Sequence, residues 1–564
     1  MKASRIVVTL LVVFGLVYAA TPAGAQNFVE RFLNRYRPVK VELPPPPGIQ
    51  AQQQLASLVR SGQLPLTVGD LINLMLENNL DVGVNRLSPR ASQYLIEAAY
   101  RQFEPTLRLQ ATVNRNTAPS TSFLTTGGAQ SFKSLGGAYS VGYSQLLETG
   151  TGVAVDFSMN RSSSNSSFNS FNPSYTGRLV YSFNQPLMRD FGRTVNTRQI
   201  RVAKNNVKIS ETQFERQLLD LVAQAQRTYW DLVFTAEDIK VKQRSMELAQ
   251  KTLSDNEIQV KIGTLAPIDV IQAESEVASR KVQLITSTYT EAQTQDQVKK
   301  LISSQGDPGL VLARLAPIEG VRKPSPTDIL PVEEAIKIAL ENRPEMRQLQ
   351  LDLENRDIDV AYTKNQLLPN VDLIGSYTQN GVGGSQSSGP NFLNPNAPVV
   401  AVRGGIGDAI TQLFGYGFTG YSVGFQVQIP LSNRAAQADS ARAITDKQIA
   451  QNRMTAQAQL IALEVRNALT QVEMQKARIE AAQKARELAE RRLEAEQKKF
   501  DLGASTIRFV LEEQRNVTQT QTDELQALVN YTKSLVDVDR ATGMTLKKNN
   551  IEIEKTLNPG AAAK

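Results

Sequence analysis

An internal duplication limits the folds that this chain of 564 residues can adopt. Residues 66–78 align with residues 330–342 at an offset of 264, and both segments end in a Leu-Glu-Asn triplet. The same offset carries Pro105 onto Pro369 without a gap. Long self-similarity of this kind marks two copies of one structural unit. We therefore expect two similar halves, each beginning with an amphipathic helical segment that stops at its proline, where the ring clashes with the preceding turn.

The hydrophobic period changes after each proline. Residues 106–113 alternate strictly between apolar and polar side chains, and residues 370–375 do so more loosely. Aromatic and aliphatic side chains alternate with small polar ones in later segments as well, namely 139–143, 153–157, 179–183 and 421–429. This pattern is typical of membrane-barrel strands, which turn one face to lipid and the other to the lumen. A soluble β-sandwich is the alternative that the alternation alone leaves open.

Segments rich in Ser, Asn and Gly separate these strands. Residues 160–173 and 380–417 are predicted to be solvated loops, because they offer little apolar surface to bury. Gly381, Gly383 and Gly384 are predicted to belong to a flexible loop rather than to a phosphate-binding turn, since no Gly-Lys-Ser or Gly-Lys-Thr follows them.

A very long polar helix is predicted after each strand block. Residues 195–262 and 433–502 contain no Pro or Gly, and a helix of that length extends for about 100 Å. Apolar residues recur at every seventh position, with a break only at Arg486, which predicts coiled-coil packing. Each helix reaches a glycine, Gly263 or Gly503, and a second helix with sevenfold spacing returns. The stripes comprise Ala225, Leu232, Ile239, Met246, Leu253 and Val260 in the first long helix, and Val465, Val472, Ile479, Leu493 and Phe500 in the second.

The first 25 residues are predicted to be a secretory signal peptide. Lys2 and Arg5 precede an apolar run from residue 6 to residue 20, and Ala23-Gly24-Ala25 forms an A-x-A cleavage site. The run is short for a membrane span, and an N-terminal anchor helix is the alternative. No other stretch reaches 18 apolar residues, so this chain could cross a membrane only as a closed β-barrel.

The composition excludes most enzyme classes. The chain contains no Cys and no His, which rules out a Ser-His-Asp triad, a Cys nucleophile, thiol redox chemistry and zinc sites built from those residues. Asp357 with Asp359, and Asp537 with Asp539, stand two residues apart on helices and point in different directions, so we expect no metal site. Without Lys2 and Arg5 the formal charge falls from +7 to +5, too little for a nucleic-acid-binding surface. We expect no catalytic residues, no cofactor and no enzymatic activity.

The order of these features resembles the outer membrane efflux protein family, the TolC-like channels, over almost the whole chain after the signal peptide. The resemblance is carried by the duplicated Leu-Glu-Asn helices and by the prolines before the first strands. Gln185-Pro186-Leu187, Tyr229-Trp230-Asp231-Leu232 and the tip from Gly263 to Val270 add to it. No single motif is specific, but their duplicated order is.

The resemblance implies a mixed fold, in which long antiparallel α-helical hairpins form an α-barrel and a membrane β-barrel is shared between the protomers of a homotrimer. It implies a passive exit duct in the outer membrane that extends into the periplasm and serves a tripartite efflux or type I secretion system. A periplasmic adaptor protein, an inner-membrane transporter and outer-membrane lipid are the implied partners. A soluble periplasmic coiled-coil scaffold or adhesin is the alternative.

The number of barrel strands departs from the family pattern, because the first half offers four strands instead of two. A tight turn at residues 148–150 joins the middle pair. We expect the extra hairpin, which carries Glu148 and Asp156, to fold over the outer mouth. A trimer would then have twelve barrel strands, and eighteen is the alternative.

The repeats and their flanks divide the chain into six parts. Residues 1–25 are the signal peptide, and residues 26–65 are an N-terminal arm with a Pro-rich linker. The first repeat takes residues 66–310, with strands in 106–186 and a helical hairpin in 188–304. A linker follows at 311–329. The second repeat takes residues 330–545, with strands in 370–430 and a hairpin in 433–544, and residues 546–564 are a C-terminal tail.

The resemblance also implies a periplasmic aperture that closes at the two glycine tips. Asp269 stands where the family's first turn has an aspartate, whereas Phe509 occupies the position where the second turn is expected to be acidic. We expect a ring of Phe509 side chains to narrow the aperture and Asp269 to pair with Arg508; an inward-packed Phe509 with a solvated Arg508 is the alternative. The expected aperture residues are Thr264, Asp269, Ser505, Thr506, Arg508, Phe509, Glu512 and Glu513.

Overall fold

The computed structural model describes residues 62–553, with breaks at 167, 264, 304–307, 326–329, 388–400 and 403, together with a few residues between 34 and 41. The chain divides into two units, residues 47–557 and residues 1–46 with 558–564, and every element named below belongs to the first. The predicted signal peptide, most of the predicted arm and the end of the predicted tail lie outside the described residues. None of the described helices is long and apolar enough to cross a membrane.

The first repeat opens with two helices and then forms strands. Helix α4 (Val68–Asn78) starts at a capping box, in which the Asp70 N–H donates to Thr67 Oγ1 at 3.1 Å. Asn79 then caps α5 (Leu80–Ala99), and the one-turn η1 (Tyr100–Phe103) ends just before the proline, as predicted. The elements that follow are β2 (Thr106–Pro119), α6 (Phe123–Thr126), β3 (Ser131–Leu146), β4 (Gly152–Ser164) and β5 (Phe171–Pro186).

The second repeat copies this order with fewer strands. Helix α11 (Val332–Asn342) has the bounds of α4 shifted by the same offset, which confirms the duplication. It is followed by α12 (Pro344–Asn365), β7 (Asn370–Ser387), β8 (Ala401–Val402), α13 (Ile406–Phe414) and β9 (Thr419–Gln428). The first strands of the two repeats, β2 and β7, also begin at equivalent positions.

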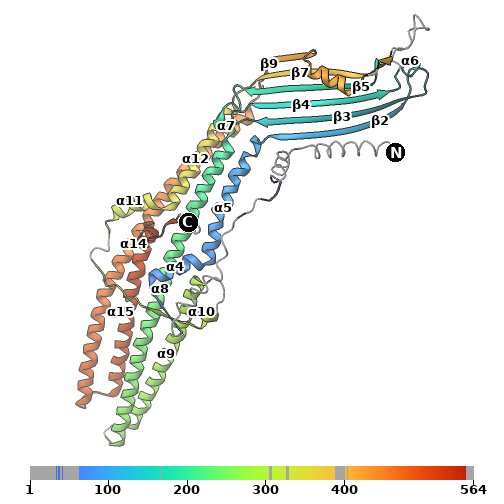
Figure 1. The fold of residues 1–564 in the computed structure, drawn as a ribbon. Coiled ribbons are helices and arrows are strands. Elements are labelled where there is room, and N and C mark those ends of the chain that lie inside the picture. The colour runs from blue at the N-terminus through green and yellow to red at the C-terminus, as the bar shows by residue number, and fades with distance from the viewer. Residues whose placement is uncertain are drawn as a thin grey trace, which may run out of the picture. The chain divides into compact units, whose positions relative to one another are not determined.

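All the long strands join one antiparallel sheet in the order β2-β3-β4-β5-β7-β9, with the short β8 added to the far part of β7 (Figure 1). The sheet has a helix end, where β2 begins and β5 and β9 lead into helices, and an outer end opposite to it. Strands β2 and β9 are the two edges.

The expectation that one hairpin folds over the outer mouth is wrong. Strands β3 and β4 pair without a break from Leu146 opposite Gly152 to Ser134 opposite Ser164, between β2 and β5. The carboxylates of Glu148 and Asp156, on which the expectation was based, are compatible with strands β3 and β4 lying within the sheet. Glu148 lies in the turn at the helix end, where it forms an ion pair with Arg193. Asp156 lies on the same face of the sheet as the small polar residues.

Within the described residues, the two segments predicted to be solvated loops contain strands and a helix, which corrects that expectation; residues 388–400 and 403 of the second segment lie outside the described residues. Strand β4 continues to Ser164 and β5 begins at Phe171, so the first loop is only a few residues long. Strand β7 runs through the glycines of the second segment, and α13 follows. A short helix within a Gly- and Ser-rich stretch gives a weak periodic signal, which explains why the composition concealed it.

The predicted long helices are present and form two hairpins. Helix α8 (Arg198–Lys261) returns as α9 (Pro267–Ile302), and α14 (Arg434–Asp501) returns as α15 (Ile507–Ala541). With 64 and 68 residues, α8 and α14 are each about 100 Å long. The turns need glycine, because Gly263 and Gly503 have φ values of +83° and +74°, where other residues are strained.

The sevenfold stripes form the helical core only in part. Val465, Val472 and Ile479 of α14 are buried against Ala527 and Tyr531 of α15. In α8 the stripe is fully buried at Ala225 and Leu232 but only half-buried from residue 239 towards the tip. Arg486, the break in the second stripe, forms an ion pair with Glu524 of α15 at 2.5 Å.

A small parallel sheet that the sequence did not indicate closes the first repeat. Strands β1 (Gln63–Leu66) and β6 (Arg314–Pro317) pair in register, next to α10 (Pro308–Leu312). Leu64 and Leu66 are buried in the main core, and the Tyr229 hydroxyl donates to the Leu66 carbonyl at 3.0 Å. The end of the predicted arm and the predicted linker are therefore joined. Two single-turn helices complete the described elements, α7 (Arg193–Asn196) and α16 (Thr545–Lys548).

Candidate functional site

The six long strands of the sheet give it one apolar face and one polar face. Because strand side chains alternate, odd-numbered residues of the six long strands share one face and even-numbered residues the other, apart from a register shift between Phe171 and Ser174 at the outer end of β5. One continuous cross-strand row of the apolar face is Leu107, Tyr143, Val155, Tyr181, Tyr377 and Tyr421. The matching row of the polar face is Thr106, Ser144, Ala154, Ser182, Ser376 and Ser422. The apolar face is exposed, with Tyr421 at 86% and Leu109 at 67%.

Charges in the half of the sheet nearer the helix end all lie on the polar face. Arg108 and Asp156 flank Gly142 in one row, and Arg178 lies in the next row out. A Cβ at residue 142 would lie 2.6 Å from Asp156 Oδ1, so a side chain there would require the Asp156 carboxylate to shift. A surface with small polar and charged groups facing one way and aromatic and aliphatic groups facing the other suits a wall between water and lipid.

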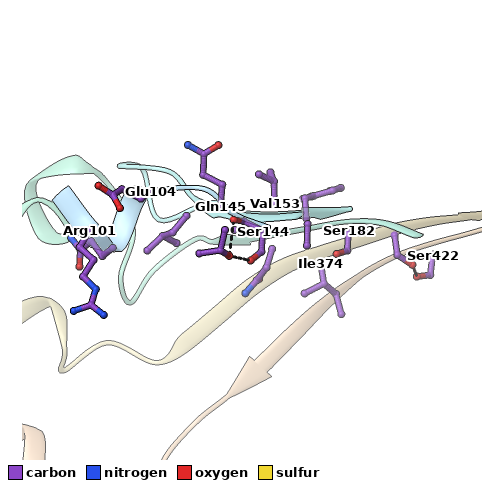
Figure 2. A pocket seen from close by; sticks show the side chains of 17 residues that line it. Arg101, Glu104, Ser144, Gln145, Val153, Ser182, Ile374 and Ser422 are labelled. Carbon is purple, nitrogen blue, oxygen red and sulfur yellow. Dashed lines mark hydrogen bonds between the residues drawn. The ribbon is translucent and has the colours of Figure 1, made fainter. Parts of the chain in front are cut away.

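The polar face is hollowed near the helix end of the sheet. A cavity of about 710 Å³ is lined by the polar row described above and by residues just before β2 (Figure 2). Among its lining residues, the Thr106 and Ser144 hydroxyls hydrogen-bond to each other at 2.7 Å. Arg101 and Glu104 approach the hollow from the helix side. Leu146, Val153 and Ile374 also line it, so the hollow combines apolar side chains with the hydroxyl row.

Both edge strands present unpaired backbone groups. On the β9 side, the Asn380 N–H donates to the Phe418 carbonyl at 2.9 Å, and these residues are opposite each other in register. Antiparallel pairs alternate between hydrogen-bonded and non-hydrogen-bonded positions. The backbone N–H and C=O groups of even-numbered β9 residues therefore bond to β7, whereas those of odd-numbered residues point away from β7, towards the free edge. On the other edge, the Ser120 N–H donates to the Gln130 carbonyl. The backbone N–H and C=O groups of odd-numbered β2 residues therefore point away from β3, towards the free edge.

The helical tips hold the predicted aperture residues. Asp269 lies in the first turn of α9, and Ser505 and Thr506 precede α15. The Ser505 hydroxyl donates to Glu496, and this bond, together with Lys499 at 2.9 Å, lowers the pKa of the Glu496 carboxyl. The Thr264 position lies outside the described residues.

The predicted aperture residues Phe509 and Arg508 point to the outside of their own hairpin. Phe509 is 53% exposed and Arg508 is exposed, whereas their neighbours Ile507 and Val510 are buried inside the second hairpin. Phe509 thus points away from its own hairpin. Among the described residues, no ion pair joins Asp269 to Arg508, so that contact stays a prediction for the assembled protein. Glu512 is exposed and Glu513 half-exposed, and the Asn516 amide donates to Glu513 at 3.3 Å.

A buried ion cluster near the tips joins the two hairpins and was missed by sequence reasoning. Glu276 of α9 receives the Arg280 Nε–H at 2.8 Å from its own helix and the Arg515 Nε–H at 2.9 Å from α15. The Glu276 and Arg280 side chains are only 2% and 4% exposed. The bond to Glu276 raises the pKa of Arg515. The spacing of four between Glu276 and Arg280 was the available signal, but it does not reveal the cross-hairpin partner.

Comparison with known proteins identifies the family. The family model for outer membrane efflux protein matches residues 152–304 and 335–544, which is more than half of the chain. This protein belongs to the outer membrane efflux protein family. It is therefore an outer-membrane transport protein, and its family is one of efflux ducts rather than of enzymes. The predicted family membership and outer-membrane location are confirmed. No match was found among curated protein sequences.

Solved structures support the same fold. The outer membrane channel CmeC of Campylobacter jejuni has 16% identity and a TM-score of 0.59, with 88% of each chain covered. The outer membrane protein VceC of Vibrio cholerae has 15% identity and a TM-score of 0.57, covering 84% of this chain and 96% of that one. The MtrE outer membrane channel of Neisseria gonorrhoeae has 16% identity and a TM-score of 0.55, with 85% and 89% covered.

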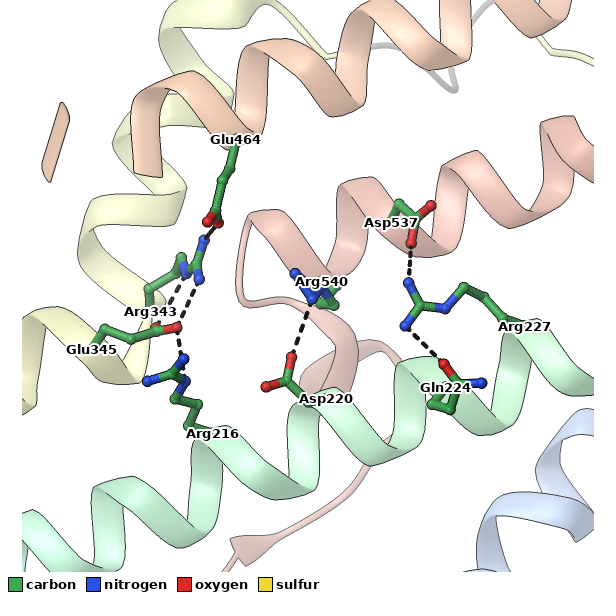
Figure 3. Close-up of polar contacts among 9 residues, drawn as sticks. All are labelled: Arg216, Asp220, Gln224, Arg227, Arg343, Glu345, Glu464, Asp537 and Arg540. Carbon is green, nitrogen blue, oxygen red and sulfur yellow. Dashed lines mark hydrogen bonds and ion pairs between the residues drawn. The ribbon is translucent and has the colours of Figure 1, made fainter. Parts of the chain in front are cut away.

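Ion pairs tie together the two halves of this outer membrane efflux protein (Figure 3). Arg343, between α11 and α12, binds Glu345 at 2.7 Å and also Glu464 of α14. Arg216 of α8 approaches Glu345 at 3.4 Å. Two further pairs join α8 to α15, Asp220 with Arg540 at 3.3 Å and Arg227 with Asp537 at 2.8 Å.

The network predicts acid sensitivity. Burial opposes ionisation of Glu345, but the hydrogen bonds from Arg343 outweigh it and hold the pKa of this carboxyl below its ordinary 4.5. The pKa of Glu345 is lower in the folded state than in the unfolded state. The stabilisation by its carboxylate is therefore complete above about pH 4.5 and is lost as the pH falls through the folded-state pKa. Glu345→Gln should lower the free energy of unfolding by about 1.5–3 kcal/mol at pH 7.

Urea unfolding of wild type and Glu345→Gln at pH 7 and at pH 4 measures this difference. The gap between the two proteins should shrink at the lower pH. A gap that is unchanged or larger at pH 4 would contradict the assigned pKa direction. Glu333→Gln, at an exposed position in the first turn of α11, is the matched control and should show little change at either pH.

Proposed function

We propose that three copies of this chain form a passive exit duct in the outer membrane, with one β-barrel built from all three sheets. The two-faced sheet with both edges unpaired carries this proposal. In lipid, each unpaired backbone group costs several kcal/mol, so the edges of a membrane sheet must be closed. Six strands enclose no useful lumen, since even eight fill the interior with side chains.

The strand directions fit head-to-tail closure. The six strands alternate in direction, so β9 of one copy runs antiparallel to β2 of the next. A ring of copies is then antiparallel throughout. Three copies, the number implied by the family resemblance, give eighteen strands, within the range of barrels that enclose an aqueous channel. The continuous pairing of β3 and β4 supports eighteen rather than twelve.

The long hairpins are proposed to form a helical duct in the periplasm. Helix α9 carries apolar side chains exposed by 47–69%, namely Ile268, Ile271, Val282, Ile285 and Tyr289. Single exposed apolar residues are ordinary, but a set along one helix fits a helical partner. We propose that a neighbouring protomer and a periplasmic adaptor cover them, and that an inner-membrane transporter supplies the energy.

Conductance in planar lipid bilayers tests the duct. The purified protein should insert and give discrete single-channel currents. Absence of currents from a protein that stays soluble without detergent would support the alternative, a periplasmic scaffold or adhesin.

The aperture is proposed to lie at the tips, narrowed by Phe509 and assisted by Asp269, Ser505, Arg508 and Glu512. Phe509→Ala should raise the single-channel conductance in bilayers, because it removes a large exposed side chain at the narrowest point. Leu502→Ala is the matched control, since Leu502 is 85% exposed in the same turn region but outside the proposed ring. Equal conductance of wild type and Phe509→Ala would refute the ring.

A further inference from the structure

Helix α13 is packed directly on the apolar face of the sheet, against β7 and β5. The contact depends on two strand glycines. A Cβ on Gly381 would lie 2.1 Å from the Ala409 carbonyl oxygen, and one on Gly383 would lie 2.3 Å from the Gly405 carbonyl oxygen. Gln412 adds a polar contact, because its Oε1 accepts the Val382 N–H at 3.0 Å. The helix is therefore an integral part of this face.

Only part of the apolar stripe of α13 is used in that packing. Ala409 and Leu413 are completely buried against the sheet. Ile406, Ile410 and Phe414 lie on successive turns of an adjoining stripe and are exposed by 49%, 39% and 57%. The helix contains no Lys or Arg, and its one carboxylate, Asp408, accepts the Gly405 N–H at 2.7 Å as a cap.

The position of α13 along the strands is informative. In register, Gly383 lies opposite Tyr175, which lies opposite Arg161. Arg161 is on the apolar face, and further out on the same face stand Arg115 and Lys133. Towards the helix end from Gly381, the apolar face carries no charged residue in the six long strands. Helix α13 thus lies where the apolar band ends and the charged rim begins.

We propose that α13 is a membrane-interfacial helix, whose exposed stripe inserts into the acyl-chain boundary of the outer leaflet. The proposal rests on the proposed barrel, in which the apolar face meets lipid. An amphipathic helix at that boundary buries its apolar stripe and keeps its polar side in water. Tyr416 and Phe418, exposed by 67% and 60%, lie between α13 and β9, and exposed aromatic side chains of this kind form the girdles of membrane barrels.

Lipid fits this stripe better than a second copy of the chain. Helix α13 packs on β7 and β5, the strands on the interior side of the β9 edge. Closure of the barrel would place the neighbouring copy against β9, on the other side. The stripe therefore continues the lipid-facing surface of its own chain.

Spin labels on single cysteines test the proposal, since the chain has no native Cys. We choose Phe414→Cys on the exposed stripe, Thr411→Cys on the polar side of α13 and Phe425→Cys on the apolar face of β9. The labelled full-length protein is reconstituted in phosphatidylcholine vesicles. Collision rates with oxygen, which concentrates in lipid, and with a water-soluble nickel chelate are measured by electron paramagnetic resonance.

The proposal predicts a higher oxygen-to-nickel ratio at residues 414 and 425 than at residue 411. A label at 414 that collides with nickel as often as that at 411 would overturn it, as would a label protected from both reagents, which would indicate cover by another chain. A high nickel rate at 425 would instead refute the lipid-facing sheet and thus the proposed barrel. If Phe414→Cys does not fold, Ile410→Cys carries the same test.

Discussion

Replacing Ala111 with proline should leave the chain folded but unable to form a stable oligomer. Ala111 is an odd-numbered residue of β2, so its N–H points away from β3, towards the free edge. Proline is tolerated on an edge strand when its N–H would have faced outward. In the assembled barrel, however, the neighbouring chain would lose the donor for one carbonyl in lipid, which costs several kcal/mol. The loss is repeated at every interface between copies.

The opposite edge gives an independent version of this experiment. Val423 of β9 also points its backbone outward, so Val423→Pro should have the same effect. Ala111→Val and Val423→Ala are the matched controls, because each changes the side chain and keeps the N–H. Native mass spectrometry in detergent measures the oligomer, and circular dichroism verifies the fold. An intact oligomer in both proline variants would contradict closure through β2 and β9.

Glu276→Ala should destabilise the region where the hairpins meet by about 3–5 kcal/mol, because it leaves the buried Arg280 guanidinium without its carboxylate. In Glu276→Ala, amide hydrogen exchange should be faster than in wild type in α9 and in the facing part of α15. Removing both charges in Glu276→Ala/Arg280→Ala should recover part of the loss, since no buried charge is then left unpaired.

Arg515→Ala separates the cross-hairpin bond from the buried charge. The Arg515 side chain is 62% exposed, so its loss should slow neither folding nor assembly and should accelerate exchange less than Glu276→Ala does. In bilayers the variant should show more frequent open events, because one bond between the hairpins near the tips is missing. Equal exchange in Glu276→Ala and wild type would contradict the structural role of this cluster.

The repeat, the long helices and the strand face alternation were predictable from sequence because their signals are long. A duplication at one fixed offset and tracts of almost 70 residues without Pro or Gly leave few alternatives. Short elements were not predictable in the same way. Strands β1 and β6 have four residues each, and α13 is a nine-residue helix inside a stretch dominated by Gly, Ser and Asn.

The sequence predicted the two faces of the sheet, but not the strand pairing or the contacts between the helical hairpins. The alternation marks which side chains share a face, but the pairing of β3 with β4 depends on register, which no local pattern states. The hairpin of β3 and β4 was expected to fold over the outer mouth because it carries Glu148 and Asp156. Glu148 lies in a turn and Asp156 on the polar face, so neither carboxylate opposes insertion of the hairpin in the sheet. Glu276 and Arg515 meet across 239 positions of sequence, so only the packed hairpins reveal their bond.

We expect three chains to complete one barrel of eighteen strands. Single-particle electron cryomicroscopy of the protein extracted in detergent, with native mass measured on the same sample, tests it most directly. The expected result is three times the mass of the mature chain and a closed ring to which each copy contributes β2, β3, β4, β5, β7 and β9. A detergent-independent monomer, or a ring of twelve strands with β3 and β4 outside it, would contradict the claim.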